Sequence, residues 1–255
     1  MDQDGGPYLL LIGLTFASTS QAAQIVVPNA NATVKGDSRL NSAPFNDPSR
    51  YQQIFAASQF GSAPLLITQI AFRPDVTQAT PFSNAFSELR IDLSTTSVAV
   101  NSLSSTFANN VGANNTTVFD QAVTLSSANL PGPGNTKQFD VIIALTTPFL
   151  YNPAAGNLLM DMRNFDPDFT GFVDGQVDLS GTITALVFAD NDPNGTTGQV
   201  QPAGGVVQFT TRSVPDSGSS LSMLVIATMA LIAAKGLASN KARQLLLIRG
   251  AAPRQ

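Results

Sequence analysis

The chain of 255 residues carries 13 Lys and Arg against 17 Asp and Glu, a net charge of -4, and it contains no His, Cys or Trp. Without His and Cys, the Ser-His-Asp and Cys-His nucleophile systems, His-ligated zinc and disulfide frameworks are excluded. The acidic excess lies in residues 24–212, with fourteen acids against eight bases, and argues against a nucleic-acid partner because phosphate binding needs a Lys- and Arg-rich surface.

The N-terminal segment has the pattern of a secretory signal peptide. An apolar run from Tyr8 to Phe16 precedes Ser20-Gln21-Ala22, whose small residues have the spacing that signal peptidase uses. Asp2 and Asp4 stand where basic residues are usual, so either the leader is atypical or translation starts upstream. The alternative is a buried strand or a short helix. We expect residues 1–23 to be a leader that is removed during export.

Residues 24–212 show the pattern of one all-β domain. Apolar residues recur mostly at period two in short runs between Pro, Gly, Asn and Asp, and no helical stripe lasts three turns. About nine strands at these intervals predict two packed antiparallel sheets, a jelly-roll-like sandwich. The expected strands are Ile25–Val27, Tyr51–Phe55, Leu65–Phe72, Leu89–Leu93, Thr117–Leu125, Phe139–Leu145, Leu158–Met162, Ile183–Phe188 and Val206–Thr210.

The side-chain pattern of some strands also predicts their place in a sheet. Leu89 to Leu93 alternates cleanly, which puts Arg90 and Asp92 on an outer face and the three aliphatic residues inside. Leu65–Phe72 and Val141–Leu145 are mainly apolar on both faces, as is typical of central strands.

Two connecting segments carry signals of their own. Ser102 to Asn109 predicts a short helix, with Ser102 as its N-cap and Leu103 and Phe107 on one face. Gly132 to Lys137 resembles a phosphate loop only superficially, because it lacks the GxxxxGK[ST] spacing and a following helix. We expect a hairpin turn there.

The loop that begins at Asp190 is a candidate calcium site. Asp190, Asp192 and Asn194 supply oxygen ligands at positions 1, 3 and 5, and Gly195 follows at position 6, as in the first half of a calcium loop. Position 12 is Gln201 where a bidentate Glu is expected. A plain turn between strands is the alternative. Apart from calcium at this loop, the sequence indicates no cofactor.

A second acidic stretch is a candidate ligand site. Asp161, Asp166 and Asp168 are interleaved with Phe165 and Phe169, and further carboxylates follow at Asp174 and Asp178. Aromatic faces suit a sugar, and a pair of carboxylates can hydrolyse a glycosidic bond. No pair stands out in the sequence, however. The alternative is a solvated loop whose Phe residues reach into the core.

The C-terminal residues 213–255 have the order of a sorting segment. The motif Val214, Pro215, Asp216, Ser217, Gly218 precedes an apolar run from Leu221 to Ala234. Basic residues follow at Lys235, Lys241, Arg243 and Arg249. A run of this length indicates a transmembrane helix, here residues 221–238, and the basic residues indicate a cytoplasmic end.

This tail resembles the C-terminal signal of the PEP-CTERM class of bacterial proteins, in its VPDSG variant. The resemblance implies a Gram-negative envelope protein with a transient inner-membrane anchor. It also implies an exosortase, a transpeptidase-like membrane enzyme, that cleaves near the motif and supplies the catalytic residues itself. An ordinary anchor that is never cleaved is the alternative.

The body is similar to a recurrent sandwich domain of PEP-CTERM proteins, and this resemblance brings no established activity. It rests on Tyr51-Gln52-Gln53-Ile54-Phe55, Ile70-Ala71-Phe72-Arg73-Pro74-Asp75, Leu93-Ser94-Thr95-Thr96 and Gly156-Asn157-Leu158-Leu159-Met160-Asp161. We therefore expect a non-enzymatic cell-surface or matrix protein associated with exopolysaccharide. The alternative is a carbohydrate-binding or carbohydrate-active module that acts on the same polysaccharide.

Overall fold

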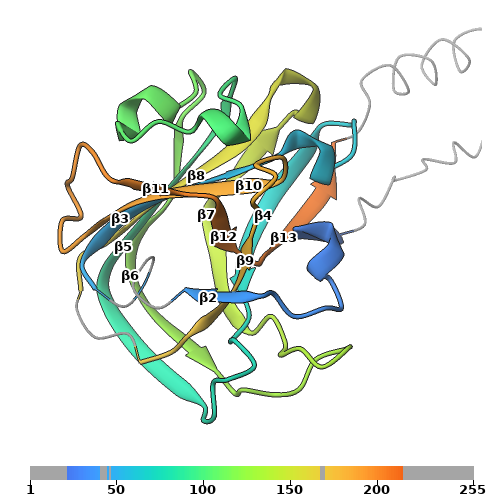
Figure 1. Cartoon of the computed structure of the whole chain (residues 1–255), viewed down its shortest axis with the longest axis vertical. Coiled ribbons are helices and arrows are strands. Elements are labelled where there is room, and N and C mark those ends of the chain that lie inside the picture. The colour runs from blue at the N-terminus through green and yellow to red at the C-terminus, as the bar shows by residue number, and fades with distance from the viewer. Residues whose placement is uncertain (1–21, 41–44, 46, 167–169, 215–255) are drawn as a thin grey trace, which may run out of the picture. The chain divides into compact units, whose positions relative to one another are not determined.

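The computed structural model describes residues 22–40, 45, 47–166 and 170–214, and this part of the chain is all-β (Figure 1). Strands pair antiparallel in each sheet. The predicted leader up to residue 21 and the predicted membrane segment 221–238 lie outside the described residues. Within the described ranges, no helix has the length and apolar character needed to cross a membrane.

Two large sheets contain the long strands. The four-stranded sheet has the order β1 (Ala22–Val27), β13 (Val207–Ser213), β4 (Leu65–Phe72), β7 (Val141–Tyr151). The six-stranded sheet has the order β11 (Gln199–Gln201), β10 (Thr184–Asp190), β3 (Ser49–Phe55), β8 (Asn157–Asn164), β5 (Phe82–Thr96), β6 (Thr116–Ser127). A small third sheet has the order β12 (Ala203–Gly205), β9 (Val173–Val177), β2 (Ser38–Leu40).

The inner faces of the two large sheets contribute to one hydrophobic core. Phe55 of β3 and Phe209 of β13 meet edge to face, with ring centroids 5.1 Å apart. In β5, Leu89, Ile91 and Leu93 all point into this core and are fully buried. Their alternation with Arg90 and Asp92 is therefore confirmed.

The all-β prediction is confirmed, and each of the nine expected strands overlaps a strand of the structure. Leu65–Phe72 matches β4, which pairs on both sides as a central strand does. The same prediction for Val141–Leu145 is wrong, because β7 is the last strand in the order of its sheet. Ile142 on its outer face is 47% exposed.

A connecting segment, residues 97–112, covers one end of the outer face of the six-stranded sheet. Its Leu103 and Phe107 belong to a second apolar cluster with Ile54 and Leu159 of the sheet. The predicted helix over Ser102–Asn109 is wrong, since two short 3-10 helices, Val100–Ser102 and Phe107–Asn110, flank an extended stretch. Polar side chains compete for the backbone there: Ser104 N–H donates to Asn110 Oδ1, and Thr106 N–H donates to Ser104 Oγ.

Short 3-10 helices also occur at Asn29–Asn31, Ala57–Gln59 and Pro153–Ala155. The predicted hairpin turn at Gly132–Lys137 is confirmed: Pro131 and Lys137 form a β-bridge, and Gly132 N–H donates to Thr136 O at 2.7 Å. Gly134 and Asn135 adopt φ values of 62° and 59° at its tip.

Candidate functional site

Charged and polar side chains gather on the outer face of the six-stranded sheet. The strand register places Gln52, Asp161 and Asp92 in one row across β3, β8 and β5. The neighbouring row holds Arg50, Arg163 and Arg90 on the same three strands. Because residues two apart on a strand share a face, both rows lie on one surface. The structure thus brings an expected site residue, Asp161, directly opposite a second carboxylate, Asp92.

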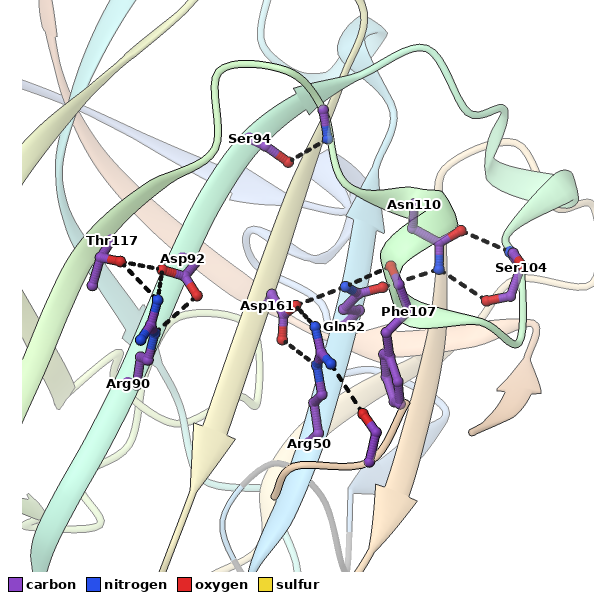
Figure 2. Close-up of polar contacts among 12 residues, drawn as sticks. Arg50, Gln52, Arg90, Asp92, Ser94, Ser104, Phe107, Asn110, Thr117 and Asp161 are labelled. Carbon is purple, nitrogen blue, oxygen red and sulfur yellow. Dashed lines mark hydrogen bonds and ion pairs between the residues drawn. The ribbon is translucent and has the colours of Figure 1, made fainter. Parts of the chain in front are cut away.

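Arg50 holds the Asp161 carboxylate with two hydrogen bonds (Figure 2). Arg50 Nη2 lies 2.6 Å from Asp161 Oδ2, and Arg50 Nε lies 3.1 Å from Asp161 Oδ1. Gln52 Nε2 donates to the same Oδ2 at 2.7 Å. The guanidinium also lies over the Phe107 ring, 4.5 Å from its centroid, and donates to Gly195 O. Asp161 is 3% exposed, so this bidentate pair is buried.

Arg90 holds Asp92 in the same way (Figure 2). Arg90 Nε and Nη2 lie 3.1 and 3.2 Å from the two carboxylate oxygens of Asp92, and the Thr117 hydroxyl donates to Asp92 Oδ1. The hydrogen bond with Asp92 raises the pKa of the Arg90 guanidinium above its ordinary value. The side chain of Arg163, between the two pairs, makes no hydrogen bond or ion pair with another described residue, and its Nε is buried without a partner.

Gln52 and Asn110 connect this cluster to the covering segment 97–112 (Figure 2). Gln52 Nε2 donates to Phe107 O at 3.2 Å, and Asn110 Nδ2 donates to Gln52 Oε1 at 2.9 Å. Ser94 Oγ accepts from Gly112 N–H at the other end of the segment. The side chains of Gln52 and Asn110 are fully buried. Their hydrogen bonds therefore replace contacts with water and fix the segment on the sheet.

The geometry favours a structural role for the two carboxylates. A retaining or inverting glycosidase needs one carboxylic acid that can give a proton and a second carboxylate that can attack or activate water. Here Asp92 and Asp161 are 4% and 3% exposed, and each carries a bidentate arginine and a further donor. Neither carboxylate has an open side for substrate or water.

The other expected residues of the acidic stretch do not join Asp161. Asp166 accepts hydrogen bonds from Ser87 N–H, Ser87 Oγ and Glu88 N–H, where β5 has a register shift opposite β6. No hydrogen bond or ion pair joins it to Asp161, although both lie in the described ranges. Asp168 lies outside the described residues. Asp166 thus attaches its loop to β5.

Two later carboxylates of the same stretch are buried. Asp174 on β9 pairs with Arg73 at 2.7 Å, and both side chains are 1% exposed. Burial raises the pKa of Asp174 although Arg73 opposes the shift. Asp178 is different: burial acts to raise its pKa, but hydrogen bonds from Ser180 and from three backbone N–H groups outweigh burial and lower it. Part of the expected solvated loop is therefore a strand and a capped turn.

The candidate calcium loop is a turn. Asp192 Oδ1 accepts from Asn194 N–H at 3.2 Å, and Gly195 N–H donates to Asp192 O at 3.1 Å. Asp190 ends β10, where partial burial and the nearby charge of Asp47 raise its pKa. Across the part of the chain that the structure describes, no group of three or more acidic side chains could hold a metal ion.

The sorting motif falls at the boundary of the described residues. Val214, the first motif residue, is 40% exposed and follows directly on β13. Pro215, Asp216, Ser217 and Gly218 lie outside the described residues. No protein-family model matches the chain, and no curated protein or solved structure gives a significant match.

One pattern in the sequence indicated the polar cluster, by which we mean Arg50, Gln52, Arg90, Asp92, Asp161 and Arg163. Each of the pairs Arg50 and Gln52, Arg90 and Asp92, and Asp161 and Arg163 stands two positions apart, with Arg50 and Arg163 directly beside the expected strands Tyr51–Phe55 and Leu158–Met162. Such pairs on three strands indicate a polar row across an outer face. The register that aligns them joins strands far apart in the chain, and periodicity carries no information on it.

Proposed function

We propose that this protein is an exported, non-enzymatic cell-surface or matrix protein that an exosortase sorts through residues 213–255. The observation that carries the proposal is the order of the tail: the VPDSG motif, an apolar run long enough for a membrane, and basic residues. In this proposal the leader expected over residues 1–23 directs secretion and is removed by signal peptidase, with its boundary moved ahead of β1, because Ala22 and Ala23 pair with β13. Residues 221–238 anchor the chain briefly in the inner membrane before it passes to the surface polysaccharide layer.

We infer that the body is a two-sheet sandwich of the jelly-roll kind. Its long strands divide between the orders β1-β13-β4-β7 and β3-β8-β5-β6, with β10 and β11 extending the second sheet. Most connections between consecutive long strands therefore cross from one sheet to the other, as in a double Greek key. Folds of this kind often present ligand surfaces, so the fold suits a surface protein without requiring an activity.

The polar cluster supports the non-enzymatic reading over a hydrolase. Asp92 and Asp161 have the strand positions of a carboxylate pair, but arginines already occupy both. A catalytic acid must exchange its proton during the reaction, and a carboxylate locked by a bidentate arginine is disfavoured for that role. The cluster is compatible with a carbohydrate-binding module, which is the other form of the alternative function.

The intact mass of the mature protein tests the sorting proposal. The full chain would be expressed in a Gram-negative host that has an exosortase, and in the same host without that gene. We expect surface protein that ends near residues 214–218 only where the exosortase is present. Asp216→Ala should leave the tail attached, whereas Ser219→Ala, just past the motif, should be processed normally. Surface protein that still carries residues 221–248 would contradict the proposal.

A further inference from the structure

A cavity of about 470 Å³ lies on the outer face of the four-stranded sheet. Its floor is formed by Gln24 and Val26 of β1 and Gln208 of β13, which sit on the face away from the core residues Val27 and Phe209. The hairpin residues 133 and 136–139 and Ala32 form its walls. Small-molecule sites have volumes of roughly 300–1,000 Å³, so the cavity is large enough for a sugar unit.

The hairpin holds its place by a close backbone approach at its tip. A Cβ atom on Gly134 would lie 1.8 Å from Thr33 O, and the φ of Gly134 is +62°. Only glycine combines this conformation with such a contact. The tip of the hairpin therefore rests against the loop that precedes β2, and this contact holds the hairpin whose residues 133 and 136–139 line the cavity.

Arg73 gives the cavity a buried cation with an unused donor. Its Nε donates to Asp174 Oδ2 and its Nη2 to Val34 O, while Nη1 is buried and has no hydrogen-bond partner. Arg73 is 1% exposed and lies over the ring of Phe139, 4.9 Å from the centroid. An unpaired buried N–H group is unfavourable, so a ligand acceptor that displaced the atoms covering Nη1 would be preferred at this point.

The remaining lining combines polar side chains with the apolar residues Val26, Ala32, Pro133 and Phe139, and it contains no carboxylate. Lys137 makes one long contact, 3.3 Å from Nζ to Asn129 O, and its charge has no acidic partner within salt-bridge distance among the described residues. The side-chain amides of Gln24 and Gln208 form no hydrogen bond with another described residue. Gln138 makes one, at 3.3 Å to Pro131 O. Amides both donate and accept, as sugar hydroxyls do.

We propose that this cavity binds an acidic sugar unit of a polysaccharide, with Lys137 and Arg73 facing the carboxylate and the three glutamines contacting the hydroxyls. The identity of the ligand rests on the proposed association with surface polysaccharide, but the cavity itself does not depend on sorting. Lys137, whose charge has no acidic partner among the described residues, selects for a carboxylate, and the glutamine amides select for hydroxyls over a simple anion. The cavity thus gives a ligand class to a body in which Asp92 and Asp161 are each held by an arginine.

Titration calorimetry of the full chain with the trimer of galacturonic acid tests this proposal. We expect saturable binding that is lost with the fully methyl-esterified trimer, which keeps the hydroxyls but not the charge. Lys137→Gln should weaken the affinity about tenfold and Gln208→Ala about fivefold. Lys35→Gln is the matched control, because Lys35 is the other lysine of the body and is exposed outside this cavity.

Three results would overturn the proposal. They are no binding of the trimer, equal binding of its methyl ester, or an affinity that Lys137→Gln and Gln208→Ala leave unchanged while both variants unfold at the wild-type temperature. If acetate or sulfate at the same concentration as the trimer displaced it, the cavity would be a general anion site, and the proposal of a sugar ligand would also be overturned. A negative binding result would not change the intact mass of the mature protein, which tests the sorting proposal. The failure of one proposal is therefore distinguishable from the failure of the other.

Discussion

Two buried Arg–Asp pairs differ in how completely their polar groups are used: Arg50–Asp161 on the outer face of the six-stranded sheet, and Arg73–Asp174, which joins the end of β4 to β9 of the small sheet. On the six-stranded sheet, the Arg50 guanidinium donates hydrogen bonds to the Asp161 carboxylate and to Gly195 O, and it lies over the ring of Phe107. Directly after β4 of the four-stranded sheet, Arg73 keeps one nitrogen unpaired and lines a cavity in which the side-chain amides of Gln24 and Gln208 have no partner among the described residues. Arg163 on the six-stranded sheet also keeps a buried Nε without a partner, so the difference lies in the cavity that Arg73 lines and not in the unpaired nitrogen alone.

The largest effect is expected at the buried pair beside the cavity. Asp174→Asn removes the negative charge and leaves Arg73 as an uncompensated buried cation, which should lower the free energy of unfolding by about 3–5 kcal/mol. Urea unfolding of the full chain followed by circular dichroism measures this value. A loss below about 1 kcal/mol would show that water reaches Arg73, and Arg73 would then no longer count as a buried cation with an unpaired donor.

Asp161→Asn should have the next largest effect, a loss of about 2–3 kcal/mol, because Arg50 is 11% exposed and keeps its contacts with Phe107 and Gly195. Ligand binding measured on the same variant compares the Asp161 region directly with the cavity. We expect the affinity for the galacturonate trimer to be unchanged by Asp161→Asn. Weakened binding by a variant that remains folded would place the ligand on the six-stranded sheet.

A pair of glycine variants tests whether the hairpin tip builds the cavity wall. Gly134→Ala should cost about 2–3 kcal/mol, since it combines a positive φ with a collision against Thr33 O. Gly61→Ala is the matched control, because Gly61 also has a positive φ, +79°, but has nothing within 4 Å of its Cβ position. It should cost only about 1 kcal/mol. Equal losses from thermal unfolding would mean that the tip can move away from Thr33.

The smallest loss of stability is expected at Asp178, whose carboxylate accepts hydrogen bonds from Ser180 and three backbone N–H groups. Its folded-state pKa is lowered, so its contribution to stability is present above the unfolded pKa, about 3.9, and is lost as the pH falls through the folded pKa. Asp178→Asn should cost about 1 kcal/mol at pH 7 and flatten the loss of stability in acid.

Asp190→Asn is the contrasting variant for this titration. The pKa of Asp190 is raised, so its ionised form is less stable in the folded chain than in the unfolded one. Removing that charge should leave stability at pH 7 unchanged or slightly higher. Unfolding curves between pH 2 and pH 7 would contradict both assignments if the two variants behaved alike.

The fold could be predicted largely from the sequence because its long strands are regular. Leu89, Ile91 and Leu93 alternate with polar residues over enough positions to indicate both strand and face. The short strands β2, β9, β11 and β12 were not predicted, since three to five residues contain too few alternations. Sheet pairing, and not local pattern, decides their conformation.

The two polar faces could not be predicted for a related reason. Arg50 and Asp161 are 111 positions apart, and Arg73 and Asp174 are 101 apart. Only the register of strands from distant parts of the chain brings them together. The sequence Gly132 to Lys137 did predict a hairpin, but where its tip rests depends on the loop that includes Thr33.

The contrast between a saturated and an open polar face can be tested in one nuclear magnetic resonance titration. Side-chain amide signals of the full chain would be followed as the galacturonate trimer is added. We predict that the signals of Gln24, Gln138 and Gln208 move together and saturate, while those of Gln52 and Asn110 stay in place. Shifts confined to Gln52 and Asn110, or no shifts at all, would contradict the assignment of the ligand to the four-stranded sheet.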